Sequence, residues 1–276
     1  MPKGSTVFAQ IMSLIPRRQF NNCVARYNGD YRIRNFSCYD QFLVMSTAQY
    51  ANKNSLRDIE ASLTAISHKL YHSGISYAVP RNTLAKANEL RDWHIYADLG
   101  QVLINKVRPL YSDDPFRLDL DNAVYAFDSS TISLCLKLCP WAKFRKTKAA
   151  IKMHTQLDLR GNIPVFIHLT DASVHDVRER WNVELFFKWI KQHLHIKSFY
   201  STSENAVYTQ IWIAVCSFLL IALAKKKWNL DQSLYTIPQT IGFVLFEEIP
   251  LNQLFNKSEN LVPVDDYPNL FSFNES

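Results

Sequence analysis

The sequence predicts a helix-rich α+β fold, and three stretches of the chain carry this prediction. Residues 1–117 contain apolar residues at three- and four-residue steps, the spacing of amphipathic helices. Residues 118–169 alternate and are rich in β-branched and aromatic residues, as strands are. Residues 211–224 form a mostly apolar run, IWIAVCSFLLIALA, followed by three lysines. We therefore expect helices, then a small antiparallel sheet, then further helices.

The composition is that of a globular protein with a polyanionic partner. Hydrophobic residues make up 47% of the chain and charged residues 20%, a balance that excludes a disordered chain. The net charge is +6 and the pI is about 9.0, which favours a partner such as nucleic acid. The chain has only six glycines and no phosphate-binding glycine loop, so a nucleotide-binding fold is disfavoured.

The cysteines and the apolar run indicate a cytoplasmic protein without a membrane segment. The five cysteines are odd in number and include no C-x-x-C pair, so we expect reduced packing residues. The run at 211–224 is shorter than the roughly 20 residues that span a bilayer. We expect a buried helix whose basic end suits the helix dipole, and a membrane anchor is the alternative.

Within residues 1–117, the apolar segment 39–50 predicts a core helix, and Ser55 is placed to cap the helix that follows it. Pro80 then precedes a predicted helix over 81–103, which opens with Arg81. Two helices joined by a glycine-containing connection suggest a helix-turn-helix-like DNA-binding unit. The connection is longer than usual for that motif, and an ordinary helical bundle explains the pattern equally well.

Earlier in the chain, three arginines surround two tyrosines in a turn-rich stretch: Arg26, Arg32 and Arg34 around Tyr27 and Tyr31. Such a mixture either contacts the DNA backbone or forms a solvated surface with tyrosines packed beneath it.

The predicted strands surround an isolated carboxylate. Residues 118–136 predict a first strand, and residues 151–159 and 163–169 predict a hairpin around Arg160 to Asn162. Asp128 stands among residues of the first strand that favour burial. A structural Asp128 would cap the turn at Ser129, whereas a functional Asp128 would bind a metal ion.

A basic run follows the first strand and is interleaved with Trp141 and Phe144: Lys143, Arg145, Lys146, Lys148 and Lys152. A run of this kind is most often a solvated loop. Because it follows the strand that carries Asp128, we interpret it as a surface that contacts the DNA backbone.

Residues 178–200 predict one amphipathic helix with a row of charges along one edge. The row contains Arg180, Glu184, Lys188, Lys191 and His195 at steps of 4, 4, 3 and 4 residues. The row is either a solvated edge with an ordinary Glu184–Lys188 pair or a phosphate-handling edge. In the second case Glu184 holds a divalent metal while the cations neutralise phosphates.

The spacing R-x3-E-x6-K at Arg180, Glu184 and Lys191 resembles the Y-x2-R-x3-E-x6-K signature of bacterial insertion-sequence transposases of the fourth IS family. These are DDE enzymes with a ribonuclease-H-like core. YAFDSST around Asp128 and QIWIAV at 210–215 extend the resemblance.

The resemblance implies that the chain is divided into three regions. Residues 1–117 would be an N-terminal helical DNA-binding domain that recognises the ends of the mobile element. Residues 118–228 would be a truncated ribonuclease-H-like core, with a three-stranded antiparallel meander and helices. Residues 229–276 would be a C-terminal helix and an acidic tail.

The resemblance also implies the chemistry. In the family, three carboxylates bind two divalent metal ions, Mg²⁺ or Mn²⁺, for cleavage and transfer of DNA strands. Asp128 matches the first carboxylate and Glu184 the third, and Arg180 and Lys191 match the phosphate-side cations. The double-stranded DNA of the element ends would be contacted by Arg81, Lys143, Arg145, Lys146, Lys148 and Lys188.

The second aspartate of the family has no counterpart here. The chain lacks a D-R-G-Y-like string, and between Thr170 and Glu184 the remaining acids are Asp171, Asp176 and Glu179. Val177 stands where the signature has tyrosine. An internal deletion near Val177 explains these departures and implies an incomplete two-metal site and impaired catalysis.

Three hypotheses follow from these observations. The chain is a bacterial, nucleoid-associated transposase by descent with an incomplete active site. Alternatively, it is a non-catalytic DNA-binding protein that inhibits or pairs with an intact transposase, as a heterodimer or as a homodimer. In the third case it is a genomic remnant that does not fold.

Overall fold

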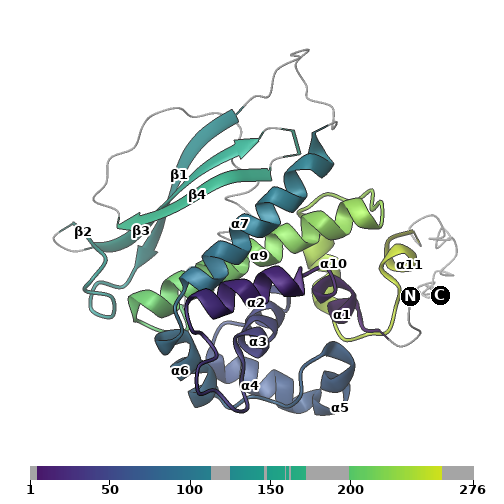
Figure 1. Cartoon of the computed structure of the whole chain (residues 1–276), viewed down its shortest axis with the longest axis horizontal. Coiled ribbons are helices and arrows are strands. Elements are labelled where there is room, and N and C mark those ends of the chain that lie inside the picture. Colours follow the sequence, from purple (N-terminus) through teal and green to yellow (C-terminus); the bar gives the residue numbers. More distant parts are fainter. Residues whose placement is uncertain are drawn as a thin grey trace, which may run out of the picture.

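Helix α9 (Glu204–Lys227) lies at the centre of the fold. It contacts α1 (Val7–Met12), α3 (Cys38–Tyr50), α6 (Arg81–Leu90) and α7 (His94–Val107). In Figure 1, α7 and α9 run between the sheet and the helices α3 to α6. The predicted buried helix over the apolar run 211–224 is therefore confirmed.

The computed structural model describes residues 5–112, 125–145, 148–158, 160–161, 163–171 and 199–256, without the side chains of residues 128, 144, 145 and 256. The remaining elements are α2 (Arg17–Arg26), α4 (Leu56–Ala65), α5 (Ser67–Leu70), η1 (Tyr71–Ser73), η2 (Arg108–Tyr111), β1 (Tyr125–Leu134), β2 (Lys143–Arg145), β3 (Lys148–Asp158), β4 (Ile163–Asp171), α10 (Thr236–Val244) and α11 (Leu251–Asn256). This is the helix-rich α+β architecture that the sequence predicts.

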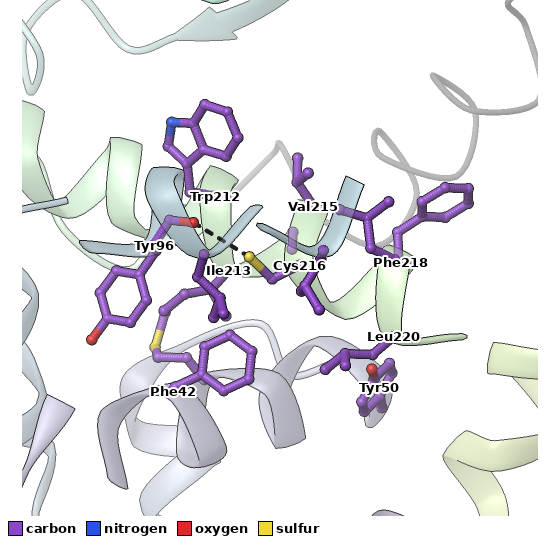
Figure 2. Close-up of a cluster of buried hydrophobic side chains, with 14 of the residues drawn as sticks. Phe42, Tyr50, Tyr96, Trp212, Ile213, Val215, Cys216, Phe218 and Leu220 are labelled. Atoms are coloured by element: carbon purple, nitrogen blue, oxygen red, sulfur yellow. Dashed lines mark hydrogen bonds between the residues drawn. The ribbon is translucent and has the colours of Figure 1, made fainter. Parts of the chain in front are cut away.

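Side chains from α3, α7 and α9 form a continuous apolar core (Figure 2). The Tyr50 hydroxyl donates to the Ser217 carbonyl oxygen at 2.9 Å, and burial raises the pKa of Tyr50. A Cβ at Gly100 would lie 3.0 Å from the Trp212 ring, so the glycine lets α7 approach α9 closely. Helix α9 is thus held by close packing and by hydrogen bonds to its own backbone.

By length and composition alone, α9 could cross a membrane, because it extends beyond the fourteen-residue run to 24 residues. Its most apolar 18-residue window is 94% buried in the fold. Its burial, rather than a short length, therefore explains its composition: α9 packs as a core helix.

The sheet is antiparallel with β3 in the centre. β1 pairs with one edge of β3, and β2 and β4 pair with the other. Residues 149–153 of β3 are buried on both faces, as a central strand requires. Gly161, at φ 75°, lies in the turn between β3 and β4, where the Tyr111 ring leaves no room for a side chain. The predicted hairpin and the three antiparallel strands are confirmed.

The basic run is not the loop that basic runs most often form. Lys143 to Arg145 form strand β2, which pairs with the start of β3, and β3 begins at Lys148 instead of Ile151. A bulge separates the two paired positions of β2. Within the run, apolar Phe144 lies between two cations and apolar Ala149 follows Lys148, and this alternation is compatible with a short hairpin. The number of charges alone does not indicate strands.

The predicted single helix over 81–103 is wrong, because Arg91 adopts an extended conformation between α6 and α7. The guanidinium of Arg91 is buried and donates to Phe36 O, to Ser37 O at 2.8 Å and to Gln41 Oε1 at 2.9 Å. Asp92 then accepts from the His94 N–H at 2.9 Å, just before α7 begins at His94. Contacts distant in sequence therefore break the helical pattern.

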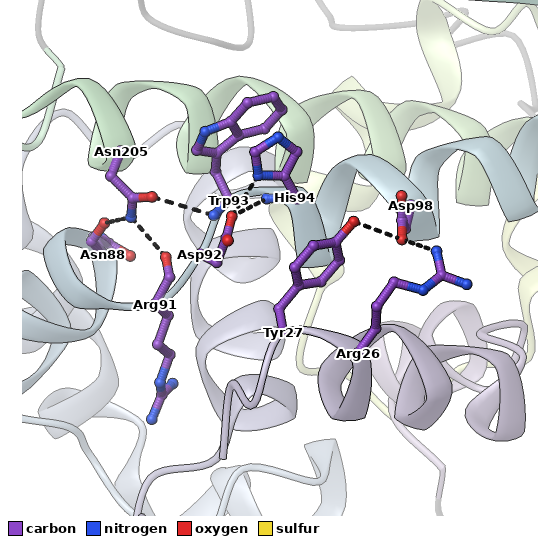
Figure 3. A network of polar contacts seen from close by, with 9 residues as sticks. All are labelled: Arg26, Tyr27, Asn88, Arg91, Asp92, Trp93, His94, Asp98 and Asn205. Carbon is purple, nitrogen blue, oxygen red and sulfur yellow. Dashed lines mark hydrogen bonds and ion pairs between the residues drawn. The ribbon is translucent and has the colours of Figure 1, made fainter. Parts of the chain in front are cut away.

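Asn205, from the first turn of α9, binds across this break (Figure 3). Its Nδ2 donates to Asn88 O at 2.9 Å and to Arg91 O at 2.6 Å, and its Oδ1 accepts from Trp93 N at 3.2 Å. One side chain therefore satisfies three backbone groups that the end of α6 and the start of α7 leave free.

Cysteines 23, 38, 139 and 216 are buried, as predicted for packing residues, and burial raises the pKa of the Cys38 thiol to about 12. Cys135 differs from the prediction because it is exposed in the turn after β1. All five thiols are free, and none is paired in a disulfide.

Substituting Asn205→Ala should lower the free energy of unfolding by about 2–4 kcal/mol, because three backbone groups lose their partner. Urea denaturation followed by circular dichroism measures this loss. The exposed Asn82→Ala on α6 is the matched control and should change stability by less than about 0.5 kcal/mol. Equal effects of the two substitutions would contradict the role given to Asn205.

Candidate functional site

Asp128 lies in the middle of β1. The described residues around it alternate, with Ser130 and Ile132 buried and Phe127 and Thr131 exposed. Asp128 occupies a position of the buried set, by the two-residue period of a strand. The strand continues through residue 129 to Leu134, so Asp128 does not precede a turn at Ser129. A structural role as a turn cap is therefore excluded.

Two unpaired hydroxyls lie next to the Asp128 position. Thr155 is its direct partner on β3, and Ser130 is two residues further along β1. Thr155 is 1% exposed and Ser130 4% exposed, and neither hydroxyl has a hydrogen-bond partner among the described residues. Buried polar groups are nearly always paired, so these two mark a place where the fold leaves hydrogen-bonding capacity unused.

The sequence analysis missed Ser130 and Thr155. The available signal was a polar residue at a buried position of an alternating strand, in register with a carboxylate. Recognising it requires the pairing of β1 with β3, which the sequence does not specify.

The strand register separates Asp128 from Asp171. Asp128 pairs with Thr155, and Asp171 pairs with Ile151, so the two positions differ by four residues along β3 and by two strand spacings across it. At about 3.4 Å per residue and about 4.8 Å per strand, their backbones lie about 17 Å apart. Two metal ions about 4 Å apart cannot be shared across that gap. Asp171 is thus excluded as the missing second ligand.

The remaining predicted residues of the charged helix edge lie outside the described residues: Arg180, Glu184, Lys188 and Lys191. The same holds for residues 178–198 of the predicted helix, for Asp176 and for Lys146, whereas the last two residues of that prediction, Phe199 and Tyr200, are described and are not helical. Within the described part of the chain, no three His, Cys, Asp or Glu side chains form a group that could hold a metal ion.

The β2–β3 hairpin presents cations on its surface. Lys143 and Lys148 are exposed, and the backbone of Arg145 pairs with Lys148. Arg145 and Lys148 are directly opposite each other, and like charges at directly opposite positions are unfavourable unless an anion compensates them. The hairpin is therefore suited to contact a polyanion, as the composition of the run predicts.

Trp141 attaches this hairpin to the start of α9. Its indole Nε1 donates to Thr202 O at 2.8 Å, and its ring lies edge-on to Tyr208 at 6.1 Å. Burial, followed by the charges of Glu204 and Asp171, raises the pKa of Tyr208 to about 12, so Tyr208 stays neutral. Trp141 therefore connects the residues just before β2 to the start of α9.

Arg81 begins α6 and is exposed, and the carboxylate of Glu60 lies next to its backbone. The backbone N–H of Arg81 donates to Glu60 Oε1 of α4 at 3.2 Å. Helices α4 and α6 contact each other, with α5 and η1 between them in the chain. Both interpretations of this region, a helix-turn-helix-like unit and a helical bundle, are compatible with that contact, although Glu60 takes up the anion-binding position at the helix start.

Two segments of the chain match models of known protein families. Residues 3–76 match a domain of unknown function (DUF4372), and residues 177–220 match the transposase DDE domain. The second range contains Arg180, Glu184 and Lys191 and extends into α9. No solved structure matches the chain.

Three curated relatives are transposases. A probable transposase for insertion sequence element IS5377 of Geobacillus stearothermophilus is 32% identical over 80 residues, 29% of this chain and 20% of the relative. A putative transposase of Sinorhizobium fredii is 35% identical over 68 residues, 25% of this chain and 19% of the relative. A putative transposase for insertion sequence element IS4SA of Synechocystis is 24% identical over 88 residues, 32% of this chain and 23% of the relative.

These matches span only about a fifth of the length of each relative. Over about a quarter to a third of its own length the chain is similar to transposases, and its residues 177–220 match the transposase DDE domain.

Proposed function

We propose that the chain is an insertion-sequence transposase of the fourth IS family that binds DNA and has lost strand cleavage. The observation that carries the proposal is the match of residues 177–220 with the transposase DDE domain. That range contains the R-x3-E-x6-K spacing at Arg180, Glu184 and Lys191.

In this proposal Asp128 and Glu184 are ligands of Mg²⁺ or Mn²⁺, and Arg180 and Lys191 neutralise the phosphates. The unpaired hydroxyls of Ser130 and Thr155 support a polar site at the Asp128 position. When bound, the metal ions would activate the attacking oxygen and stabilise the leaving one. The chain's own residues would hold the DNA backbone against that site.

The loss of cleavage follows from the missing second carboxylate. Two ions in a phosphoryl-transfer site need ligands that fix both of them. The strand register argues against Asp171 in that role, and we take Asp176, near the start of the predicted helix, as the candidate substitute. An internal deletion near Val177 accounts for the missing segment.

The proposed DNA contacts are the exposed cations of the hairpin, Lys143 and Lys148, together with Arg145, Lys146, Lys188 and Arg81. We propose that residues 1–117 recognise the element ends, that residues 118–228 form a ribonuclease-H-like core, and that residues 229–276 follow it. Helix α9 would join the first two parts, because it contacts α3, α6 and α7.

The second candidate function is a DNA-binding protein that does not cleave DNA. It is favoured by the strand register, which keeps Asp171 away from the Asp128 position. A chain with a DNA-contacting surface and an incomplete set of carboxylates can occupy element ends without cleaving them. It would then inhibit an intact transposase, or pair with one as a heterodimer, or act as a homodimer. Cleavage by an intact relative, measured with increasing amounts of this chain, distinguishes inhibition from pairing.

Affinity for duplex DNA should fall steeply with salt, because the contacts release counterions. The slope of log K against log salt should be about −0.9 for each phosphate neutralised. Replacing Lys143, Arg145 and Lys148 together by alanine should reduce the magnitude of this slope by about 2–3 and weaken binding to all sequences alike. Fluorescence anisotropy from about 50 to 200 mM salt measures both quantities.

The matched control neutralises three exposed cations outside the hairpin, Arg57, Lys86 and Lys106. An unchanged salt slope in the hairpin variant, or an equal loss in the control, would remove the hairpin from the interface.

No strand cleavage is expected with Mg²⁺ or Mn²⁺ on supercoiled plasmid that carries the DNA flanking the gene. The physical reason is the missing ligand that bridges two ions. Gel electrophoresis detects nicked and linear products. Metal-dependent nicking that disappears in Asp128→Asn would contradict the proposed loss of activity. Even then Asp171→Asn should leave nicking unchanged, because its backbone lies about 17 Å from that of Asp128.

A further inference from the structure

We infer that the exposed face of helix α2 enters the major groove of double-stranded DNA and contacts base edges. This inference rests on the proposed DNA binding and names the element that selects the sequence. Its starting point is the unusual surface of α2, RRQFNNCVAR. Only Phe20, Cys23 and Val24 are buried, and the remaining seven residues are exposed.

The exposed residues of α2 form one continuous surface. At 100° per residue, they cover more than half of the helix circumference, and the buried three occupy the rest. The exposed set is Arg17, Arg18, Gln19, Asn21, Asn22, Ala25 and Arg26, and it contains no acidic residue. Arginine, asparagine and glutamine are the side chains that form paired hydrogen bonds with guanine and adenine in the major groove.

The fold itself makes little use of these side chains. Within the described residues, Arg18, Gln19, Asn21 and Asn22 form no polar contact with the rest of the chain. Asparagine is a poor helix former, so two adjacent ones in the middle of α2 do not favour the helix. Neither helix stability nor packing explains them, whereas a partner at this face does.

The positive charge around α2 complements the negative charge of a phosphate backbone. Residues 17–36 contain five arginines and one acid, Asp30, a net charge of +4 (5 − 1). The Asp30 carboxylate is engaged, since its Oδ1 accepts from Cys38 N at 2.6 Å. Arg32 and Arg34 are exposed in the loop after α2. These two arginines are placed to contact phosphates beside a groove that α2 occupies.

The dimensions also fit. Ten helical residues span about 15 Å, and the major groove is about 12 Å wide. Along one side of α2, a hollow of about 300 Å³ lies between side chains of α2 and α7, which contact each other. Its lining is rich in amides, with Gln19 and Asn22 from α2 and Gln101 and Asn105 from α7. The ion pair of Arg26 with Asp98, drawn in Figure 3, closes one side of this hollow.

Helix α6 is the rival element, and its surface is less suitable. The carboxylate of Glu60 binds the backbone at its start, and Glu89 and Leu90 are exposed near its end. Glu89 belongs to the exposed face of α6 itself and repels phosphates, whereas the acid beside α2, Asp98 of α7, is paired with Arg26. Of the two helices, α2 alone combines exposed amides with an exposed face free of acids.

The test selects a preferred duplex from a random-sequence library with the wild-type chain. The affinity for that duplex is then compared with the affinity for a shuffled duplex of equal length. In Asn21→Ala/Asn22→Ala, the ratio of the two affinities should fall by about fivefold or more, because each base contact contributes about 5- to 150-fold. The control Asn82→Ala/Lys86→Ala removes two exposed polar side chains from α6, neither of them a proposed DNA contact, and should keep the ratio.

Both variants alter exposed side chains, and their circular dichroism and melting should match the wild type. A ratio in Asn21→Ala/Asn22→Ala that stays within about fivefold of wild type overturns the assignment of α2. So does a larger loss in the α6 control. A wild-type chain that binds no duplex overturns the proposed DNA binding and this assignment together. If the wild type binds duplex DNA and the affinity ratio of the α2 variant is unchanged, only the assignment of α2 is overturned.

Discussion

The burial of α9 is the constraint on which the rest of the structure depends. A helix this apolar is stable in water only if other elements cover it along its whole length. Helices α3, α6 and α7 cover it, and the hairpin is attached to its first turns by Trp141. Polar contacts complete the packing where backbone groups would otherwise stay unpaired, as Tyr50 does at Ser217.

The central helix also explains how the two regions that we propose to contact DNA come together. Its N-terminal end contacts Trp93 through Asn205 and the hairpin through the Thr202 carbonyl. Cations that precede β3 and helices from the first 112 residues therefore share one support. A DNA duplex that contacts both regions would be held by elements whose relative position α9 fixes.

Much of this arrangement could be predicted from the sequence, because local rules decide it. The cap at Ser55, the alternation of β3 and β4 and the long apolar helix each follow from a local pattern. The break at Arg91 could not be predicted in this way, since it depends on carbonyls more than 50 residues away. The unpaired hydroxyl of Thr155 and the exclusion of Asp171 likewise require the strand register.

Native-state hydrogen exchange tests most directly whether α9 holds the helices and the sheet together as one unit. The account predicts that amides of residues 207–224 exchange most slowly, through global unfolding, and that amides of α3, α7 and β3 show the same dependence on denaturant. Strand amides that exchange through a separate opening of lower free energy, while the helices stay protected, would contradict the account. In that case the sheet would be an independent unit that merely rests on the helices.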